Sequence, residues 1–594
     1  MKNRTSSHVF VLAATVLFTG IAHYSIHYAA MLRGYETSAL VAYRNIALVA
    51  IMAALPVFLK KFLNFHGGWT LFTSCILLFS IGLVIQYRLF TDNEYLADVS
   101  RDDVAKVENS NLSDREKSRA LLRLRLQAIA REREEKIETQ QMRYIKENYS
   151  PEKKQMMGLP ATPAEPVDLS KEKLRSSNVA LSAVLASNNT LIPIFAILFF
   201  VMAFVAMRRD DVLVFLRDHG FIIVLLTLAP LILAAITSSG GKSIGNMTPW
   251  EPAKIPFLVG FAAILSVLYK KLAKTHWGLP HAKDVLPLAF MAVLPFVPFL
   301  VLKDFGQMMV FGAVYATLYL IAVRRFSQRF VLVGSVGLVM AVLIVGALPR
   351  PTQERIPLLP TLATPVRWVL PDRIQQRFHL WLDGFNPPPP ETAWWKSDYD
   401  DYYSDLVKRQ PGLPAMIEEE PTLQRTINVD AWFDILAFQP AQATFGIASG
   451  GVTGRGLGLG HPEVIPVADS DYIYAALGEE LGLFGGLLLI LALIVFVSAG
   501  VKTAQDSRDM FSKLCVTGLA AFIGFQALVN IGGITRALPM TGITLPFVSH
   551  GGFSLLTSFV MLGMLLAFSH RNAIDRMKDE AEVLPGDRGV KFDY

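Results

Sequence analysis

The sequence has few cysteines and few charged residues. Its two cysteines, Cys75 and Cys515, both lie inside apolar runs of the 594-residue chain. The sequence therefore indicates neither a disulfide framework nor a cysteine-based metal site. Charged residues make up 18% of the chain, against about 25% in soluble domains, which argues against a set of ordinary soluble domains.

Apolar residues, by contrast, are abundant. They make up 52% of the chain, and the mean hydropathy is +0.39. Many apolar runs have roughly 17–25 residues, the length that a helix needs to cross the hydrocarbon layer. Cytoplasmic Lys and Arg explain the pI of about 9.0 better than nucleic-acid binding does. The first run continues to about Met31 without a convincing cleavage site, so we expect a retained helix rather than a signal peptide.

The sequence predicts an all-α polytopic membrane protein with about twelve spans. The predicted spans are 9–30, 38–58, 68–88, 190–207, 220–238, 254–270, 284–302, 307–323, 330–348, 472–500, 512–532 and 552–569. Every even-numbered span is followed by basic residues, beginning with Lys60 and Lys61 and ending with Arg571, Arg576 and Lys578. Because Lys and Arg mark cytoplasmic ends, both termini are predicted to be cytoplasmic.

Two long polar segments are then predicted to lie outside. In the first, 91–189, the stretch 113–148 has a capping box and helix-forming residues. It is interpreted as a solvated spacer helix or, alternatively, as a docking helix for a partner protein, followed by a Pro-rich linker at 158–166. In the second, 349–470, tryptophans and a Tyr/Asp cluster at 398–405 fit either sugar binding or an ordered cap over the membrane mouth.

Ionisable residues at span ends are candidates for function. Asp471 lies where the second long segment enters an apolar helix, so it fits a general base or a helix N-terminal acid with Asp469 or Ser470 as the cap. Glu479 and Glu480 lie about two turns deeper in the same helix, where carboxylates need partners.

Glu251 and Lys254 are three residues apart and share a helix face. They fit either an ion pair or a phosphate-binding lysine held by the glutamate. Asp304, at another outer turn, fits a helix cap or a site residue.

A Pro/Gly-interrupted loop follows Gln526 and Asn530. Such a loop beside a membrane must be buried in protein or line a cavity. Arg536, Thr541 and Ser549 in this loop could hold anionic oxygens, and structural packing is the alternative.

Together these motifs resemble one family, the SEDS proteins (RodA, FtsW and SpoVE). The stretch "ALPMTGITLPFVSHGGFS" is similar to the family signature LPxTGxxLPFxSYGGSS. Four further stretches are similar to family segments in the same order: "TPWEPAK", "KDFGQ", "FQPAQATFGIASGGVTGRGLGLG", which begins with Phe438 and Gln439, and "IPVADSDYIYAALGEELGLFG". The sequence departs from the family in "SSGGKSIGNM", ahead of "TPWEPAK", which lacks the family's Trp and has Lys242 in place of its Arg. Val467, Asp469, His550 and Phe553 also replace the residues usual in the family.

The resemblance implies a ten-span core with two additional N-terminal spans. The chain then divides into 1–66 (the additional spans), 67–90 (first core helix), 91–189 (an insertion), 190–348 (core helices), 349–470 (large outer loop), 471–570 (C-terminal core helices with the signature loop) and 571–594 (cytoplasmic tail).

The resemblance also implies an activity: polymerisation of lipid II by an inverting glycosyl transfer from undecaprenyl-pyrophosphate-linked glycan. It places the catalytic role on Asp471, and substrate binding on Glu251, Lys254, Asp304, Gln439, Arg536, Thr541 and Ser549. Lys254, Arg536 or a divalent cation (Mg²⁺ or Mn²⁺) is expected to stabilise the leaving pyrophosphate.

The implied partner is a class B penicillin-binding protein, and the implied location is the bacterial cytoplasmic membrane. A lipid II flippase and a non-catalytic scaffold for the transpeptidase remain alternatives. No paired inverted repeat of the transporter kind is evident in the sequence.

Overall fold

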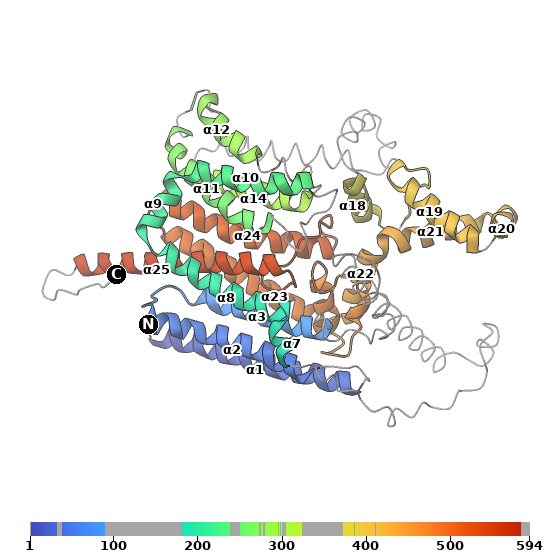
Figure 1. Ribbon diagram of the computed structural model, residues 1–594, viewed down its shortest axis with the longest axis horizontal. Helices are drawn as coiled ribbons and strands as arrows, with labels where there is room; N and C mark the ends of the chain where they lie inside the picture. The colour runs from blue at the N-terminus through green and yellow to red at the C-terminus, as the bar shows by residue number, and fades with distance from the viewer. Residues whose placement is uncertain are drawn as a thin grey trace, which may run out of the picture.

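The structure is a computed structural model, and it is built almost entirely of helices (Figure 1). It describes residues 2–32, 38–89, 181–237, 250–272, 275–276, 279–294, 296, 299, 304–323, 372–384, 386–409 and 411–583. The predicted helix at 113–148, the linker at 158–166, Lys242 and the ninth predicted span, 330–348, lie outside these residues.

Eight of the described helices are long and apolar enough to cross a membrane. They are α1 (Lys2–Leu32), α2 (Ala39–Phe62), α3 (Thr70–Leu89), α8 (Asn188–Met207), α11 (Trp250–Leu272), α23 (Ile473–Asp506), α24 (Met510–Ile534) and α25 (Gly552–Val583). Each coincides with a predicted span, so the polytopic all-α fold is confirmed. Predicted spans 220–238, 284–302 and 307–323 correspond to the shorter helices α10 (Gly220–Thr237), α12 (Ala282–Val293) and α14 (Phe305–Ala322), and the count of twelve stays a prediction.

The remaining elements are short or lie in the loops. They are α7 (Leu181–Ala186), α9 (Asp210–Asp218), the antiparallel pair β1 (Thr275–His276) and β2 (Leu279–Pro280), α18 (Asp372–Asp383), α19 (Ala393–Arg409), α20 (Leu413–Glu419), α21 (Thr422–Trp432), a π-helical turn (Phe433–Ala437), α22 (Phe438–Gly450) and a 3-10 turn (Pro462–Val464). The two strands form a single tight turn and leave the all-α class unchanged.

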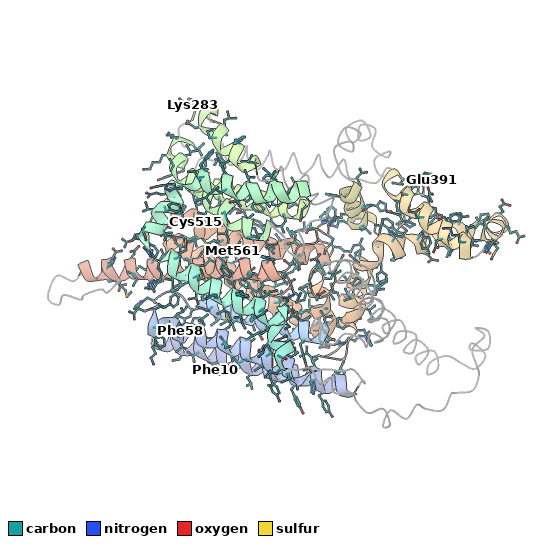
Figure 2. All side chains as sticks on the ribbon, viewed as in Figure 1. Phe10, Phe58, Lys283, Glu391, Cys515 and Met561 are labelled. Carbon is teal, nitrogen blue, oxygen red and sulfur yellow. The ribbon has the colours of Figure 1, made fainter. Side chains whose placement is uncertain are left out.

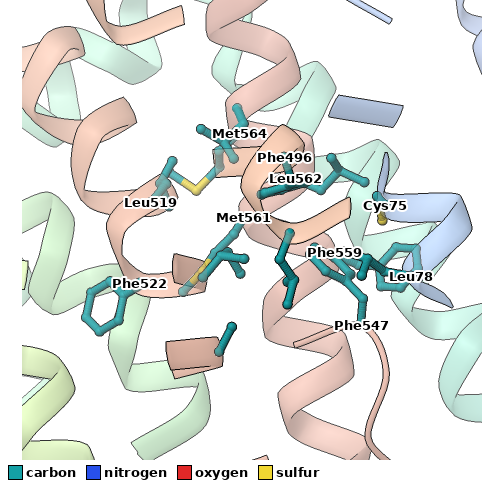
Figure 3. Close-up of a cluster of buried hydrophobic side chains, with 14 of the residues drawn as sticks. Cys75, Leu78, Phe496, Leu519, Phe522, Phe547, Phe559, Met561, Leu562 and Met564 are labelled. Carbon is teal, nitrogen blue, oxygen red and sulfur yellow. The ribbon is translucent and has the colours of Figure 1, made fainter. Parts of the chain in front are cut away.

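The long helices form a bundle in which α3, α23, α24 and α25 occupy the middle (Figure 1). On one side α1 and α2 pack against α3, and on the other α11 and α14 pack against α24. Fully buried apolar side chains fill the centre, including Cys75, Phe496 and Phe559 (Figure 3). By contrast, Phe10 on α1 and Phe58 on α2 are 74% and 46% exposed (Figure 2), as expected of side chains that face lipid.

The first three helices are joined by buried polar contacts. Thr19 of α1 shares a hydrogen bond of 2.7 Å with Ser80 of α3. The amide nitrogen of Asn45, from α2, lies 3.1 Å from Nε2 of His23, and the His23 ring packs against Tyr87. All of these side chains are almost fully buried, so α1 and α2 are fixed parts of the bundle.

Among the described residues, α2 and α8, which precede basic exits, end where α1 begins and α25 ends (Figure 1). Arg208, after α8, donates to the carbonyl of Leu63 at 2.8 Å. Arg571 of α25 donates to the carbonyl of Arg208 at 3.1 Å and pairs with Asp210. These contacts show that the basic ends share one side of the bundle.

The outer segment, residues 372–450, extends from the opposite end (Figure 1). Two of its tryptophans, Trp395 and Trp432, are 0% exposed and pack edge to face with ring centroids 5.4 Å apart, so these two offer no open surface to a sugar. Tyr399 completes this small core. Of the two predictions for this segment, the ordered cap fits these residues better.

Candidate functional site

The predicted constellations meet at the end of the bundle opposite the termini. The signature loop, residues 535–551, connects α24 to α25 there. Asn530 at the end of α24 donates to the carbonyls of Asp471 (2.9 Å) and Ile543 (2.6 Å). Ser549 donates to the carbonyl of Ser470 at 2.6 Å. The segment that carries Asp471 is thus fastened directly onto the signature loop.

Asp471 is half-buried at this junction. Its Oδ1 accepts a hydrogen bond from Ser470 Oγ at 3.0 Å, and its Oδ2 lies against Gly542 of the loop. The N-cap of α23 is Tyr472, and its side chain makes no capping hydrogen bond. The interpretation of Asp469 or Ser470 as the helix cap is therefore wrong, since neither occupies the capping position.

Glu251 and Lys254 form a buried ion pair at the start of α11. Lys254 Nζ lies 2.8 Å from both carboxylate oxygens of Glu251 and 2.9 Å from Oε1 of Gln526. Three acceptors match the three N–H groups of an ammonium. Gln526 in turn donates to the carbonyl of Thr544 in the signature loop at 3.0 Å. The pair therefore reaches the loop through Gln526.

Asp304 is the N-cap of α14 and accepts a hydrogen bond from the backbone N–H of Gln307 at 3.3 Å. The capping interpretation of Asp304 thus holds. The side-chain amide nitrogen of Gln307 lies 3.5 Å from Oε1 of Glu251, while the buried Oε1 of Gln307 has no hydrogen-bond partner among the described residues. By capping α14, Asp304 therefore helps to place the Gln307 amide beside the Glu251–Lys254 pair. Gln526 supplies the other amide, on Lys254.

Three predicted binding residues of the site differ in what they contact. Thr541 is buried, and its carbonyl accepts a hydrogen bond from Arg377 of α18 at 2.9 Å. Arg536 has a positive φ of 60° and donates to the carbonyl of Leu380, also in α18, at 3.2 Å. The remaining residue, Gln439, is exposed on α22. Thr541 and Arg536 thus tie the loop to α18, while Gln439 lies apart from these contacts.

The hydroxyl of Ser549 both donates and accepts a hydrogen bond within the protein. It donates to Ser470, and it accepts from the backbone N–H of Leu545 at 2.8 Å. Its neighbour His550 donates its backbone N–H to the carbonyl of Asp469 at 2.8 Å. The packing interpretation of the loop therefore applies to Ser549.

The two deeper carboxylates have the partners that their depth requires. Glu480 pairs with Arg88 of α3 at 2.9 Å, with both side chains almost fully buried. Arg88 also donates to the carbonyl of Gly460 at 2.8 Å, and Glu479 accepts from the backbone N–H of His461 at 2.8 Å. Local sequence did not mark Arg88, although a lone arginine at the end of an apolar span is a usable signal.

Arg377 is the other residue that the sequence analysis missed. It lies in the long polar segment, and only the return of α18 to the signature loop brings it to the site. A small groove borders the loop, with Gln86, Asn189 and His550 among its polar lining residues.

The described residues contain no group of three His, Cys, Asp or Glu side chains suited to a metal ion. The predicted Mg²⁺ or Mn²⁺ therefore has no such ligand set among them.

Fold and site together define a polytopic membrane protein with a polar site at one end of its bundle. The sequence profile of the FTSW_RODA_SPOVE family, described as a cell cycle protein, matches residues 426–574, which carry Asp471 and the signature loop. The match over these residues agrees with the resemblance to SEDS proteins.

Three relatives illustrate the likeness. The chain is 28% identical over 381 residues to "Peptidoglycan glycosyltransferase RodA" of Mycobacterium tuberculosis, covering 60% of this chain and 66% of that one. It is 38% identical over 150 residues to "Probable peptidoglycan glycosyltransferase FtsW" of Synechocystis, covering 25% and 37%. It is 36% identical over 148 residues to "Stage V sporulation protein E" of Bacillus subtilis, covering 24% and 40%. The chain thus spans less than two thirds of each relative's length.

Two solved structures are also similar. One is a chain of a peptidoglycan synthase complex, with a TM-score of 0.43 and 19% identity over 65% of this chain and 88% of that chain. The other is RodA of Thermus thermophilus, with a TM-score of 0.30 and 16% identity over 64% and 95%.

Proposed function

We propose that this chain is a peptidoglycan glycosyltransferase that polymerises lipid II into glycan strands for cell elongation or division. The observation that carries the proposal is the placement of Asp471, a half-buried carboxylate fastened onto the signature loop. The names of the relatives, which include peptidoglycan glycosyltransferases, support the reaction type.

In the proposed reaction Asp471 is the general base. It takes the proton from the 4-hydroxyl of the acceptor's GlcNAc while that oxygen bonds to the anomeric carbon of the donor's terminal MurNAc. The bond from that carbon to the pyrophosphate oxygen breaks, and undecaprenyl pyrophosphate leaves with the electron pair. Membrane spans hold both lipid-linked substrates, which reduces the translational freedom that the sugars must lose.

The other predicted binding residues support the loop in this conformation. Lys254 is occupied by Glu251 and Gln526, and Arg536 is bound to carbonyls of α18. We therefore assign both to shaping the site, which leaves Arg377 as the cation beside the reacting carboxylate. Thr541 and Asp304 belong to the same supporting framework.

The protein is proposed to act at the outer face of the bacterial cytoplasmic membrane, with its termini in the cytoplasm. A class B penicillin-binding protein, whose transpeptidase crosslinks new strands, is the proposed partner. The outer segment extends from the end of the bundle that holds the site (Figure 1), which suits contact with such a partner.

The first test replaces Asp471 by Asn in the purified full chain and measures lipid II polymerisation. We expect the rate to fall by about 10²–10⁴-fold, the usual contribution of a general base. The matched control is Asp400→Asn, the same change at a 56%-exposed position of α19, for which we expect the wild-type rate.

A normal rate for Asp471→Asn would remove the residue from the chemistry. If wild-type protein moved lipid II across sealed vesicles and formed no glycan, the flippase alternative would replace polymerisation. If it did neither and only bound the transpeptidase, the scaffold alternative would hold.

A further inference from the structure

Arg377 reaches the site from the outer segment. It lies on α18, and its Nη1 donates to the carbonyl of Thr541 in the signature loop at 2.9 Å. Arg377 is half-buried. An arginine bound to a carbonyl keeps its charge, so α18 brings a permanent cation to a loop that otherwise packs against α24 and α25.

The same loop brings Arg377 and Asp471 to one point, Gly542. A Cβ built on Gly542 would lie 3.2 Å from Asp471 Oδ2 and 3.6 Å from Arg377 Nη2. Gly542 has a φ of +71°, which favours glycine. The absence of a side chain there lets the carboxylate and the guanidinium approach the same backbone atom from two elements.

The electrostatics of Tyr472 agree with this placement. Burial is the main cause that raises the pKa of the Tyr472 hydroxyl, the charge of Asp471 raises it further, and the charge of Arg377 lowers it. Both charges thus act on one phenol next to the site. The phenol stays neutral, which leaves Arg377 and Asp471 as the charged pair.

Two anchors fix the position of α18. On the loop side, Trp381 Nε1 donates to the carbonyl of Arg536 at 2.9 Å. On the outer side, Trp432 Nε1 donates to the carbonyl of Gly384 at 3.0 Å, and its ring packs edge to face against His379. The helix that carries Arg377 is therefore held between the signature loop and the aromatic core of the outer segment.

We propose that Arg377 is a positioning residue for Asp471, whose guanidinium keeps the carboxylate ionised and oriented at the signature loop. This inference rests on the proposed glycosyltransferase function. A nearby opposite charge favours the charged form of a carboxyl group, and a general base must be deprotonated to accept the proton. The outer segment thereby supplies part of the site.

Other ionisable groups belong to the two segments that meet at Asp471. They are Asp469 and Tyr472 on its own segment, and Arg536 and His550 on the signature loop. Arg536 is directed to carbonyls of α18, and His550 is tied to Asp469 through its backbone. Arg377 is the cation that shares Gly542 with Asp471.

The test measures lipid II polymerisation against pH for wild type, Arg377→Ala and Arg377→Lys. Without the cation, Asp471 holds its proton to higher pH, so the acid limb of the kcat profile of Arg377→Ala should move to higher pH. Its maximal kcat should also fall by up to about 10²-fold, the cost of a misplaced catalytic group, with KM unchanged. Arg377→Lys keeps the charge and should restore the position of the acid limb.

Lys396→Ala is the matched control, because Lys396 is a 57%-exposed cation of the same outer segment. Its profile should overlie that of wild type. Arg377→Met serves as a second neutral variant, and thermal unfolding of each protein in detergent shows whether it is folded.

If the acid limb of the kcat profile stayed at its wild-type pH in both Arg377→Ala and Arg377→Met, the proposal would be overturned. A raised KM with that limb unmoved would assign Arg377 to pyrophosphate binding instead. Failure of the glycosyltransferase function itself is distinguishable, because the wild-type protein would then form no glycan or Asp471→Asn would be fully active.

Discussion

Lys254 is 1% exposed and Glu251 is 5% exposed, so their pairing takes place away from water. Removing one member of such a pair leaves a buried charge without compensation, and this costs far more than the intact pair contributes. The ammonium also holds Gln526, which donates to the signature loop. A single side chain in α11 thus helps to determine the shape of a loop almost three hundred residues later.

We predict that Glu251→Gln lowers the free energy of unfolding by about 3–5 kcal/mol, because Lys254 then keeps its charge without a carboxylate. Equilibrium unfolding in mixed detergent micelles measures this loss. The proposed polymerisation activity should fall as well, since Lys254 is then no longer held beside Gln526.

The control for this prediction is Asp400→Asn, which breaks the exposed pair with Lys396. Exposed pairs contribute at most about 1 kcal/mol, so this variant should unfold almost as wild type does. If both variants lost the same free energy of unfolding, burial would not determine how much the ion pair of Glu251 and Lys254 contributes to stability.

At the scale of elements, α23 is bent where it passes the Gly-rich loop at residues 451–460. Gly482 has φ 64° and ψ −162° inside the helix. A Cβ there would lie 2.2 Å from the backbone nitrogen of Gly454 and 2.6 Å from the carbonyl of Val452. The bend admits the loop, whose glycine Gly456 donates to the carbonyl of Glu480 at 2.9 Å.

Gly482→Ala should therefore destabilise the protein by about 1–3 kcal/mol, the range for a residue forced into an unfavourable backbone region. The clash with two backbone atoms adds to that loss, because neither can rotate away. Unfolding in detergent is again the measurement.

Gly20→Ala provides the comparison, because Gly20 lies in α1 with nothing within 4 Å of a built Cβ. Alanine is the better helix former by about 1 kcal/mol, so this variant should be unchanged or more stable. If the two variants were equally stable, Gly482 would not define the bend.

Sequence patterns predicted the spans well and their interruptions poorly. The apolar runs at 68–88 and 190–207 became Thr70–Leu89 and Asn188–Met207, because crossing a membrane requires about 20 apolar residues in a row. The bend at Gly482 depends on a loop that lies nearly thirty residues earlier, and no local pattern records that contact.

The candidate site likewise contains residues that the sequence predicted and residues that it did not. Asp471, Glu251 and Lys254 were predicted because charges at span ends are costly. Arg377 was not, since it lies in a polar helix where an arginine is unremarkable by composition. Its role appears only when α18 returns to Thr541. Arg536, predicted as a free cation for phosphate, is instead bound to Leu380.

At the scale of the whole molecule, the two ends of the bundle differ in character. One end gathers basic residues, including Arg508, which pairs with Asp579, and Arg576, which pairs with Asp506 at 3.2 Å. The outer segment extends from the other end (Figure 1), where Asp471 lies against the signature loop. Basic residues concentrate on the cytoplasmic side of membrane proteins, so we predict that the site lies outside.

This sidedness predicts the outcome of cysteine labelling. Both native cysteines, Cys75 and Cys515, are 0% exposed, so they should react slowly with a membrane-impermeant maleimide. Ser404→Cys, exposed on α19, should be labelled in right-side-out vesicles. Asp218→Cys, 51% exposed on α9, should be labelled only after the vesicles are opened. The reverse labelling pattern would show that the protein has the opposite topology.

The polar contacts among the first three helices bear on how the protein is synthesised. Thr19 and His23 reside in α1, the first helix made, while their partners Ser80 and Asn45 follow on α3 and α2. A polar side chain that faces lipid lacks hydrogen-bond partners. The nascent α1 is therefore poorly suited to stand alone in the bilayer, and we expect the three helices to leave the insertion machinery as a group.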